Sequence, residues 1–224
     1  MEIDIQYKPA HSLARVSLQP GETIEAEAGA MVGMSHNVTM TTSAGGAAKG
    51  FKRLFGGESF FRNQFTAEDH TGEVLLAPSL CGDMVVLDVE HSPWFIQSSS
   101  YVASSTGVEL NTQLGGFKTF FAGEGLFLLQ ASGSGQVLTS AFGALERIDV
   151  DGCVVIDTGH LVAWQDIPSL RYRVTKASTG WIASYLSGEG LICEFEGHGA
   201  VWIQTRNPSE YGRLMGRILP ARSR

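Results

Sequence analysis

The chain has 224 residues, of which 43% are hydrophobic and 17% are charged, and its formal net charge is −7. This balance excludes disorder as the overall state, because disordered chains combine low hydrophobicity with high net charge. Charged residues and glycines interrupt every long apolar stretch, so we expect no transmembrane helix. The N-terminus lacks the pattern of a secretory signal, and Glu2 and Asp4 argue against a mitochondrial presequence. We therefore expect a cytoplasmic protein.

The charge is unevenly distributed along the chain. Residues 206–224 contain five arginines and one acidic residue, Glu210, and carry a net charge of +4, which leaves −11 on residues 1–205. An acidic body repels polyanions, so we do not expect nucleic acid as a partner.

Strand-like patterns run through most of the chain. Residues 84–89 and 148–156 are β-branched or alternate between apolar and polar residues, as strands do. Clusters of Gly, Ser and Asn separate such runs every 8–12 residues, and the chain has 27 glycines. These patterns predict an all-β protein.

Three landmarks recur in the same order and predict an internal repeat of about 65 residues. The first comprises AGAMVGMS (28–35), SSSYVASS (98–105) and TGHLVAWQ (158–165). The second is a Gly-Glu turn containing Glu58, Glu124 or Glu189. The third comprises GEVLLA (72–77), GQVLTS (135–140) and GAVWIQ (199–204). We therefore expect one domain over residues 1–224, with repeats at about 10–75, 76–140 and 141–206.

A unit of this length exceeds a solenoid rung and a propeller blade. We expect the three units to close around a pseudo-threefold axis, because closure removes exposed sheet edges.

The C-terminal segment, 207–224, predicts a short helix followed by a basic tail. Asn207 is a favourable N-cap, and Pro208 suits the first helical turn. Apolar residues then recur at helical spacing until Pro220 ends the pattern over 208–219. We expect this apolar face to dock on the β body. The helix also offers the only membrane contact that the sequence suggests.

The sequence contains none of the common catalytic or nucleotide-binding motifs. It has no G-x-S-x-G, P-loop, G-x-G-x-x-G or H-E-x-x-H pattern, and its three cysteines lie far apart. We therefore expect no metal, no cofactor and no enzymatic activity.

Five acidic or histidine side chains remain as candidates. Asp157 and His160 could form a general acid–base pair, since His160 stands where the other repeats have Ala or Ser. They could equally stabilise a turn. The acids Glu58, Glu124 and Glu189 could form a ring of carboxylates that binds a cation or a partner, or each could hydrogen-bond within its own loop.

Four longer strings carry a resemblance to a known family. They are GGESFFRNQFTA (56–67), GEVLLAPSLCGDMVVLDV (72–89), VIDTGHLVAW (155–164) and SGEGLICEFEGHGAVWIQTRN (187–207). Together they resemble the altered-inheritance-of-mitochondria family over about residues 3–219. Bacterial and archaeal members are mostly proteins of unknown function.

The resemblance implies repeats similar to the subunit of the tryptophan RNA-binding attenuation protein, a short double-stranded β-helix. It also implies a trimer, which by analogy would form a ring of nine units. Yeast-type members imply a mitochondrial role, which we do not transfer to a chain without a presequence. We expect a non-enzymatic oligomeric scaffold or binding protein. The alternatives are a ring that binds a small ligand or RNA, and an enzyme that uses Asp157 and His160.

Overall fold

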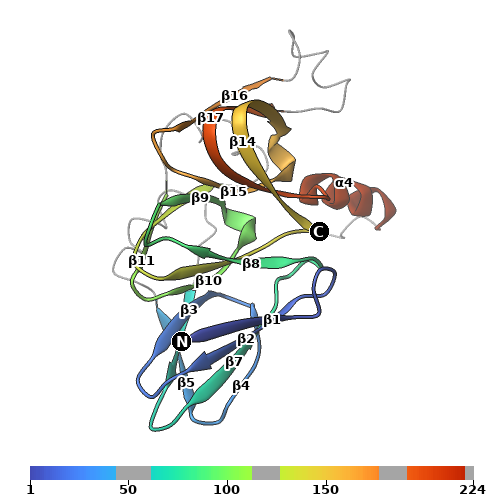
Figure 1. The fold of residues 1–224 in the computed structure, drawn as a ribbon. Coiled ribbons are helices and arrows are strands. Elements are labelled where there is room, and N and C mark those ends of the chain that lie inside the picture. The colour runs from blue at the N-terminus through green and yellow to red at the C-terminus, as the bar shows by residue number, and fades with distance from the viewer. Residues whose placement is uncertain (44–61, 113–126, 177–190, 220–224) are drawn as a thin grey trace.

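The computed structural model describes residues 1–43, 62–112, 127–176 and 191–219. Strands dominate this part of the chain, and one α-helix, α4, follows the last of them (Figure 1). The elements are β1 (Glu2–Gln6), β2 (Leu13–Leu18), β3 (Thr23–Glu27), β4 (Met31–Met34), β5 (Val38–Ser43), β6 (Arg62–Ala67), β7 (Gly72–Leu76), β8 (Met84–Asp88), β9 (Trp94–Gln97), β10 (Tyr101–Ser105), β11 (Val108–Thr112), β12 (Leu128–Gly133), β13 (Gln136–Ser140), β14 (Leu145–Asp157), β15 (Leu161–Gln165), β16 (Leu170–Lys176), β17 (Leu191–Gln204) and α4 (Pro208–Ile218).

Many strands bury every second side chain, as expected for strands that cover a core with one face. In β2, Ala14, Val16 and Leu18 are buried while the residues between them are partly exposed. Strand β7 buries Val74 and Leu76 in the same manner. The alternation fixes the register, because a shift by one residue would expose the buried set.

The strands of the described residues form three sheets. The first has the order β1-β2-β7-β4. The second has the order β5-β6-β3-β10-β13-β8, and the third has the order β11-β12-β9-β15-β17-β14, with β16 also paired to β17. The second and third sheets each combine strands that are distant in sequence, through the antiparallel pairs β3–β10 and β9–β15.

In the part of the chain that the structure describes, buried apolar side chains gather in three clusters. One is centred on β2, β3, β6 and β7, the next on β9, β12 and β13, and the last on β14, β15 and β17. Figure 1 shows the corresponding strands following one another from the N-terminal end of the molecule to the other end.

The prediction of a predominantly β fold with a short C-terminal helix is confirmed. Closure around a pseudo-threefold axis is not confirmed. Closure would require the edge strand β4, near the N-terminus, to pair with the edge strand β14, near the C-terminus. These two strands lie at the ends of different sheets.

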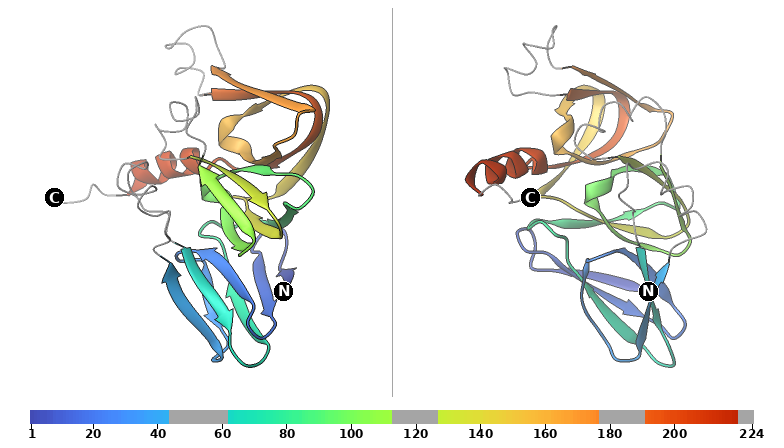
Figure 2. Two further views of the ribbon diagram at one scale, coloured as in Figure 1. Left: turned by 90° about the vertical axis from the view of Figure 1, so that its left-hand side faces the viewer. Right: turned by 180° about the vertical axis from the view of Figure 1, so that it is seen from behind.

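Helix α4 begins as the sequence predicts. Asn207 Oδ1 accepts hydrogen bonds from Ser209 N at 2.9 Å and Glu210 N at 3.3 Å. The expected docking of its apolar face is wrong, however, because no residue of α4 is buried. The helix lies beside the sheets (Figure 2) and contacts the loop between β13 and β14, where the ring centroid of Phe142 is 5.1 Å from that of Tyr211. Within the described residues, no helix has the length and apolarity needed to cross a membrane.

Candidate functional site

The candidates Asp157 and His160 occupy the tight turn between β14 and β15, where Thr158–His160 form a single 3-10 turn. Asp157 Oδ1 accepts a hydrogen bond from Gly159 N at 2.7 Å. Thr158 Oγ1 donates to Leu191 O at 3.0 Å, which fixes the turn to the start of β17. The Asp157 carboxylate therefore caps its own turn.

His160 is fixed by the end of β17. Its Nδ1 lies 2.7 Å from Gln204 O. The buried Gln204 side chain donates to Gly159 O at 3.0 Å and accepts from Phe142 N at 2.9 Å. Asp157 thus has a partner within the turn, and His160 has one at the end of β17. These hydrogen bonds support the structural alternative.

Gly159 packs directly against Asn207, the residue before α4. A Cβ atom at Gly159 would lie 2.1 Å from Asn207 Nδ2, far closer than any real contact. Asn207 is also the N-cap of α4. Because a side chain at Gly159 would displace the cap, glycine at this position lets the helix start directly against the turn.

The remaining candidates are the three glutamates, a metal site and the buried cysteine. Glu58, Glu124 and Glu189 lie outside the described residues. Within the described ranges, no group of three or more His, Cys, Asp or Glu side chains could hold a metal ion. Burial raises the pKa of the Cys193 thiol to about 12, so this cysteine is unsuited to act as a thiolate nucleophile near neutral pH.

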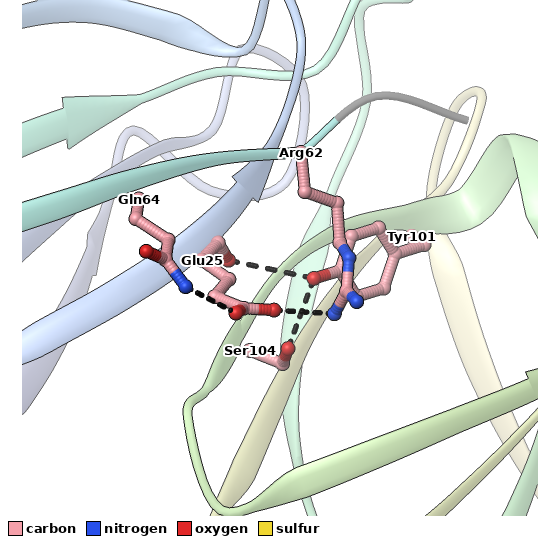
Figure 3. A network of polar contacts seen from close by, with 5 residues as sticks. All are labelled: Glu25, Arg62, Gln64, Tyr101 and Ser104. Atoms are coloured by element: carbon pink, nitrogen blue, oxygen red, sulfur yellow. Dashed lines mark hydrogen bonds and ion pairs between the residues drawn. The ribbon is translucent and has the colours of Figure 1, made fainter. Parts of the chain in front are cut away.

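A polar network that the sequence analysis missed lies where β10 pairs with β3 (Figure 3). Glu25 forms an ion pair with Arg62 and accepts a hydrogen bond from Gln64 Nε2 at 2.9 Å. The buried Tyr101 hydroxyl donates to Glu25 O at 3.4 Å and lies 2.9 Å from Ser104 Oγ. Burial raises the pKa of Tyr101 to about 12. This network links the three neighbouring strands β3, β6 and β10.

An aromatic cluster lies where β15 pairs with β9. Trp164 is directly opposite Phe95 in the ladder, and their ring centroids are 5.6 Å apart. Tyr172 and Phe195 approach Trp164 edge-on at 5.3 Å and 5.6 Å. Such pairs contribute about 0.5–1.5 kcal/mol each beyond their buried area.

The edge strands β4 and β14 both leave apolar side chains exposed. Within the described residues, β4 pairs only with β7, and Met31, Val32 and Met34 are 36%, 59% and 42% exposed. The second half of β14 pairs with β17 on one side, and its Val155 is 53% exposed. An exposed apolar edge strand favours pairing with another chain.

Sequence reasoning did not find these edges, because Met-Val-Gly-Met reads as an ordinary buried strand. One available signal was the first landmark, which aligns Val32 with Val102 and Val162. Both of the latter are buried. Val32 lies on an edge strand, whereas Val102 and Val162 lie on strands that are paired on both sides.

Comparisons with known proteins place this architecture in a family. The family model described as "Mitochondrial biogenesis AIM24" matches residues 3–206. An uncharacterized protein of Streptococcus pyogenes serotype M6 is 31% identical over 235 residues, covering 100% of this chain and 93% of that protein. The X-ray crystal structure of a Streptococcus pyogenes protein matches with a TM-score of 0.82 and 26% identity, covering 97% of this chain and 99% of that chain.

The matched family model spans all the described strands except the outermost residue of β1. The solved relative extends the similarity to nearly the whole chain. On these grounds, the chain belongs to the AIM24 family.

Proposed function

We propose that the chain consists of three copies of one six-strand unit and joins other copies head-to-tail into a non-enzymatic oligomeric scaffold. The observation that carries the proposal is the pair of exposed apolar edges on β4 and β14. Each edge corresponds to a strand that, elsewhere in the chain, is covered by the neighbouring unit.

The order of strand pairing supports three units. The first, sixth and third strands of each unit pair in the orders β2-β7-β4, β8-β13-β10 and β14-β17-β15. The fourth, fifth and second pair in the orders β5-β6-β3, β11-β12-β9 and β16-β17-β14. In the last unit, the long strands β14 and β17 each supply two strands of the pattern.

A recurring irregularity aligns the three units residue by residue. The register shifts between Met31 and Gly33 in β4. Equivalent shifts occur between Tyr101 and Ala103 in β10, and between Leu161 and Ala163 in β15. A bulge re-aims the side chains around it, so its position marks equivalent sites. Met34, Ser104 and Trp164 are therefore counterparts.

The two junctions between units inside the chain show which pairing partner is missing from the first unit and from the last. At both, the second strand of one unit pairs with the third strand of the next, with Glu25 opposite Ser104 and Phe95 opposite Trp164. The last unit has an uncovered second strand in β14, and the first unit has an uncovered third strand in β4. Applying the same register places Val155 of one copy opposite Met34 of the next.

The exposure of equivalent residues supports this pairing. Val102 and Val162 are buried, at 1% and 0% exposed, whereas their counterpart Val32 is 59% exposed. A second copy would cover Val32 and Val155 while satisfying the free backbone groups of both edges. Because the two edges differ, the contact is heterologous, and such contacts form rings when the rotation closes. Three chains would form a ring of nine units.

The non-enzymatic part of the proposal rests on the turn of Asp157 and His160. Each side chain has a hydrogen-bond partner within the turn or at the end of β17. A general acid or base must instead reach the substrate. In this account both residues position β15 for its pairing with β9.

Native mass spectrometry of the purified chain tests the assembly, compared with the variant Val155→Glu. We expect a mass of three chains for the wild type and of one chain for the variant, because a carboxylate at the junction would be buried without a partner. The matched control is Met40→Glu, since Met40 is similarly exposed but lies on β5, at the end of a different sheet from β4 and from β14.

A wild-type monomer, or a Val155→Glu variant that keeps the wild-type mass, would contradict the proposal. The same spectrum reports retained small molecules or RNA. A stoichiometric non-protein mass would show that the assembly binds a ligand rather than serving as a scaffold alone.

A further inference from the structure

Helix α4 presents an apolar face that the described part of the protein leaves uncovered. Tyr211, Leu214 and Ile218 are 43%, 53% and 67% exposed, although their spacing places them on one side of the helix. Only Tyr211 has a described ring contact with the β body, through Phe142. An amphipathic helix normally buries its apolar face, so we expect another surface to bind the exposed face of α4.

Cationic side chains border this face. Arg213 and Arg217 directly precede Leu214 and Ile218, about 100° away around the helix. Arg213 pairs with Glu210, the one acidic residue of the segment, at 2.5 Å. A groove of about 460 Å³ runs between the helix and the body, lined by Phe142, Arg206, Asn207, Glu210, Tyr211, Arg213, Leu214 and Arg217. Three arginines and one glutamate thus line this groove.

The charge distribution favours one kind of occupant. Residues 206–224 carry a net charge of +4, whereas the rest of the chain carries −11. An anionic surface would attract the C-terminal segment and repel the body, so contact would be confined to the helix. Clusters of four to eight basic residues beside an amphipathic helix are typical of anionic lipid binding. Arg213 and Arg217 lie on α4 itself, and three more arginines flank it within 206–224.

We infer that α4 docks on an anionic lipid surface. Leu214 and Ile218 enter the boundary between headgroups and acyl chains, and Arg206, Arg213 and Arg217 contact lipid phosphates. A helix that lies in the membrane plane needs an apolar face beside a cationic one, which α4 provides. The inference is independent of the head-to-tail assembly, because neither β4 nor β14 takes part.

The test is co-sedimentation of the full chain with vesicles. We expect binding to vesicles that contain phosphatidylglycerol, none to vesicles of phosphatidylcholine alone, and release as the salt concentration rises. The paired substitution Arg213→Glu with Arg217→Glu should lower the partition coefficient at least tenfold, because each basic residue contributes about fivefold near such a surface. Leu214→Glu with Ile218→Glu should abolish binding.

These variants alter exposed residues, so the β body should remain folded, and circular dichroism checks this. The matched control is Arg147→Glu, an equally exposed arginine on β14 whose partner is Asp149. Three outcomes would overturn the inference. The first is binding to vesicles of phosphatidylcholine alone, and the second is binding that survives the α4 substitutions. The third is a wild-type chain that does not bind vesicles, together with a changed oligomeric mass in the variant that carries Leu214→Glu and Ile218→Glu. The last would identify a second copy as the occupant.

Discussion

The two junctions within the chain use the same backbone pairing but opposite side-chain chemistry. Where β3 meets β10, Glu25 lies opposite Ser104 and carries an ion pair to Arg62. Where β9 meets β15, Phe95 lies opposite Trp164 in an aromatic cluster. The two pairings therefore share one backbone arrangement, whereas the side chains that they bring together differ.

The proposed contact between copies resembles the apolar junction more closely. It would bring Val155 opposite Met34, two exposed apolar residues that hydrogen-bond to nothing through their side chains. A junction of this kind is stabilised by burial of apolar surface, at about 25 cal/mol per Å². The polar junction instead depends on complete satisfaction of its buried groups.

The largest expected effect is at the aromatic junction. Trp164 is 1% exposed and central to its cluster, so Trp164→Ala leaves a large cavity. We expect a loss of about 3–5 kcal/mol in the free energy of unfolding. Urea denaturation measures it. A loss below about 1 kcal/mol would show that the cluster does not hold the junction together.

At the polar junction we expect a smaller effect. Glu25→Gln keeps the shape of the side chain but leaves Arg62 without its carboxylate, which should cost about 1–3 kcal/mol. The control is Arg173→Ala, which breaks the pair with Glu194, where the arginine side chain is 75% exposed. Exposed pairs contribute about 0–1 kcal/mol. Equal losses in the two variants would mean that burial adds nothing to the Glu25–Arg62 pair.

The stability of the protein should also respond to pH through a group beside the polar junction. Burial raises the pKa of Glu27, at the end of β3, to about 7, from an ordinary value near 4.5. Ionising the Glu27 carboxyl therefore costs more free energy in the folded state than in the unfolded state. Stability should fall as pH rises from about 4.5 through about 7, by roughly 1–2 kcal/mol after allowance for partial exposure.

The variant Glu27→Gln isolates this contribution, because it has no proton to lose. Thermal unfolding at a series of pH values should show the wild type losing stability relative to the variant across that window. Parallel curves for the two proteins would exclude Glu27 as the source.

The smallest effect is expected at the turn that leads into β15. His160→Ala removes the hydrogen bond from Nδ1 to Gln204 O and should cost about 1 kcal/mol. This corresponds to a fall of about 2–4 °C in Tm for a chain of this size. Calorimetry measures the change. An unchanged Tm together with a lost phenotype would instead favour the enzyme hypothesis.

Local patterns in the sequence predicted the local structure well. Alternation in stretches such as Met84–Asp88 predicted strands, and Asn207 with Pro208 predicted the start of α4. Both depend on neighbouring residues alone. The fate of the apolar face of α4 depends on distant surfaces, and there the prediction failed.

The candidate site shows the same limit. His160 stood out because it interrupts the repeat, but its partner Gln204 is 44 residues away in the sequence. The network around Tyr101 joins residues from three separate segments. No short motif encodes such contacts, because they arise only when the sheets have paired.

Site-directed cross-linking tests the head-to-tail account most directly. The chain would carry Met34→Cys and Val155→Cys, with the exposed native thiols removed by Cys81→Ser and Cys153→Ser. Residues directly opposite each other in antiparallel strands have Cβ atoms about 4.5–5.5 Å apart, close enough for oxidation to link them. The account predicts disulfide-linked dimers and trimers on a non-reducing gel. Unlinked chains only, or equal linking when Met40→Cys replaces Met34→Cys, would contradict it.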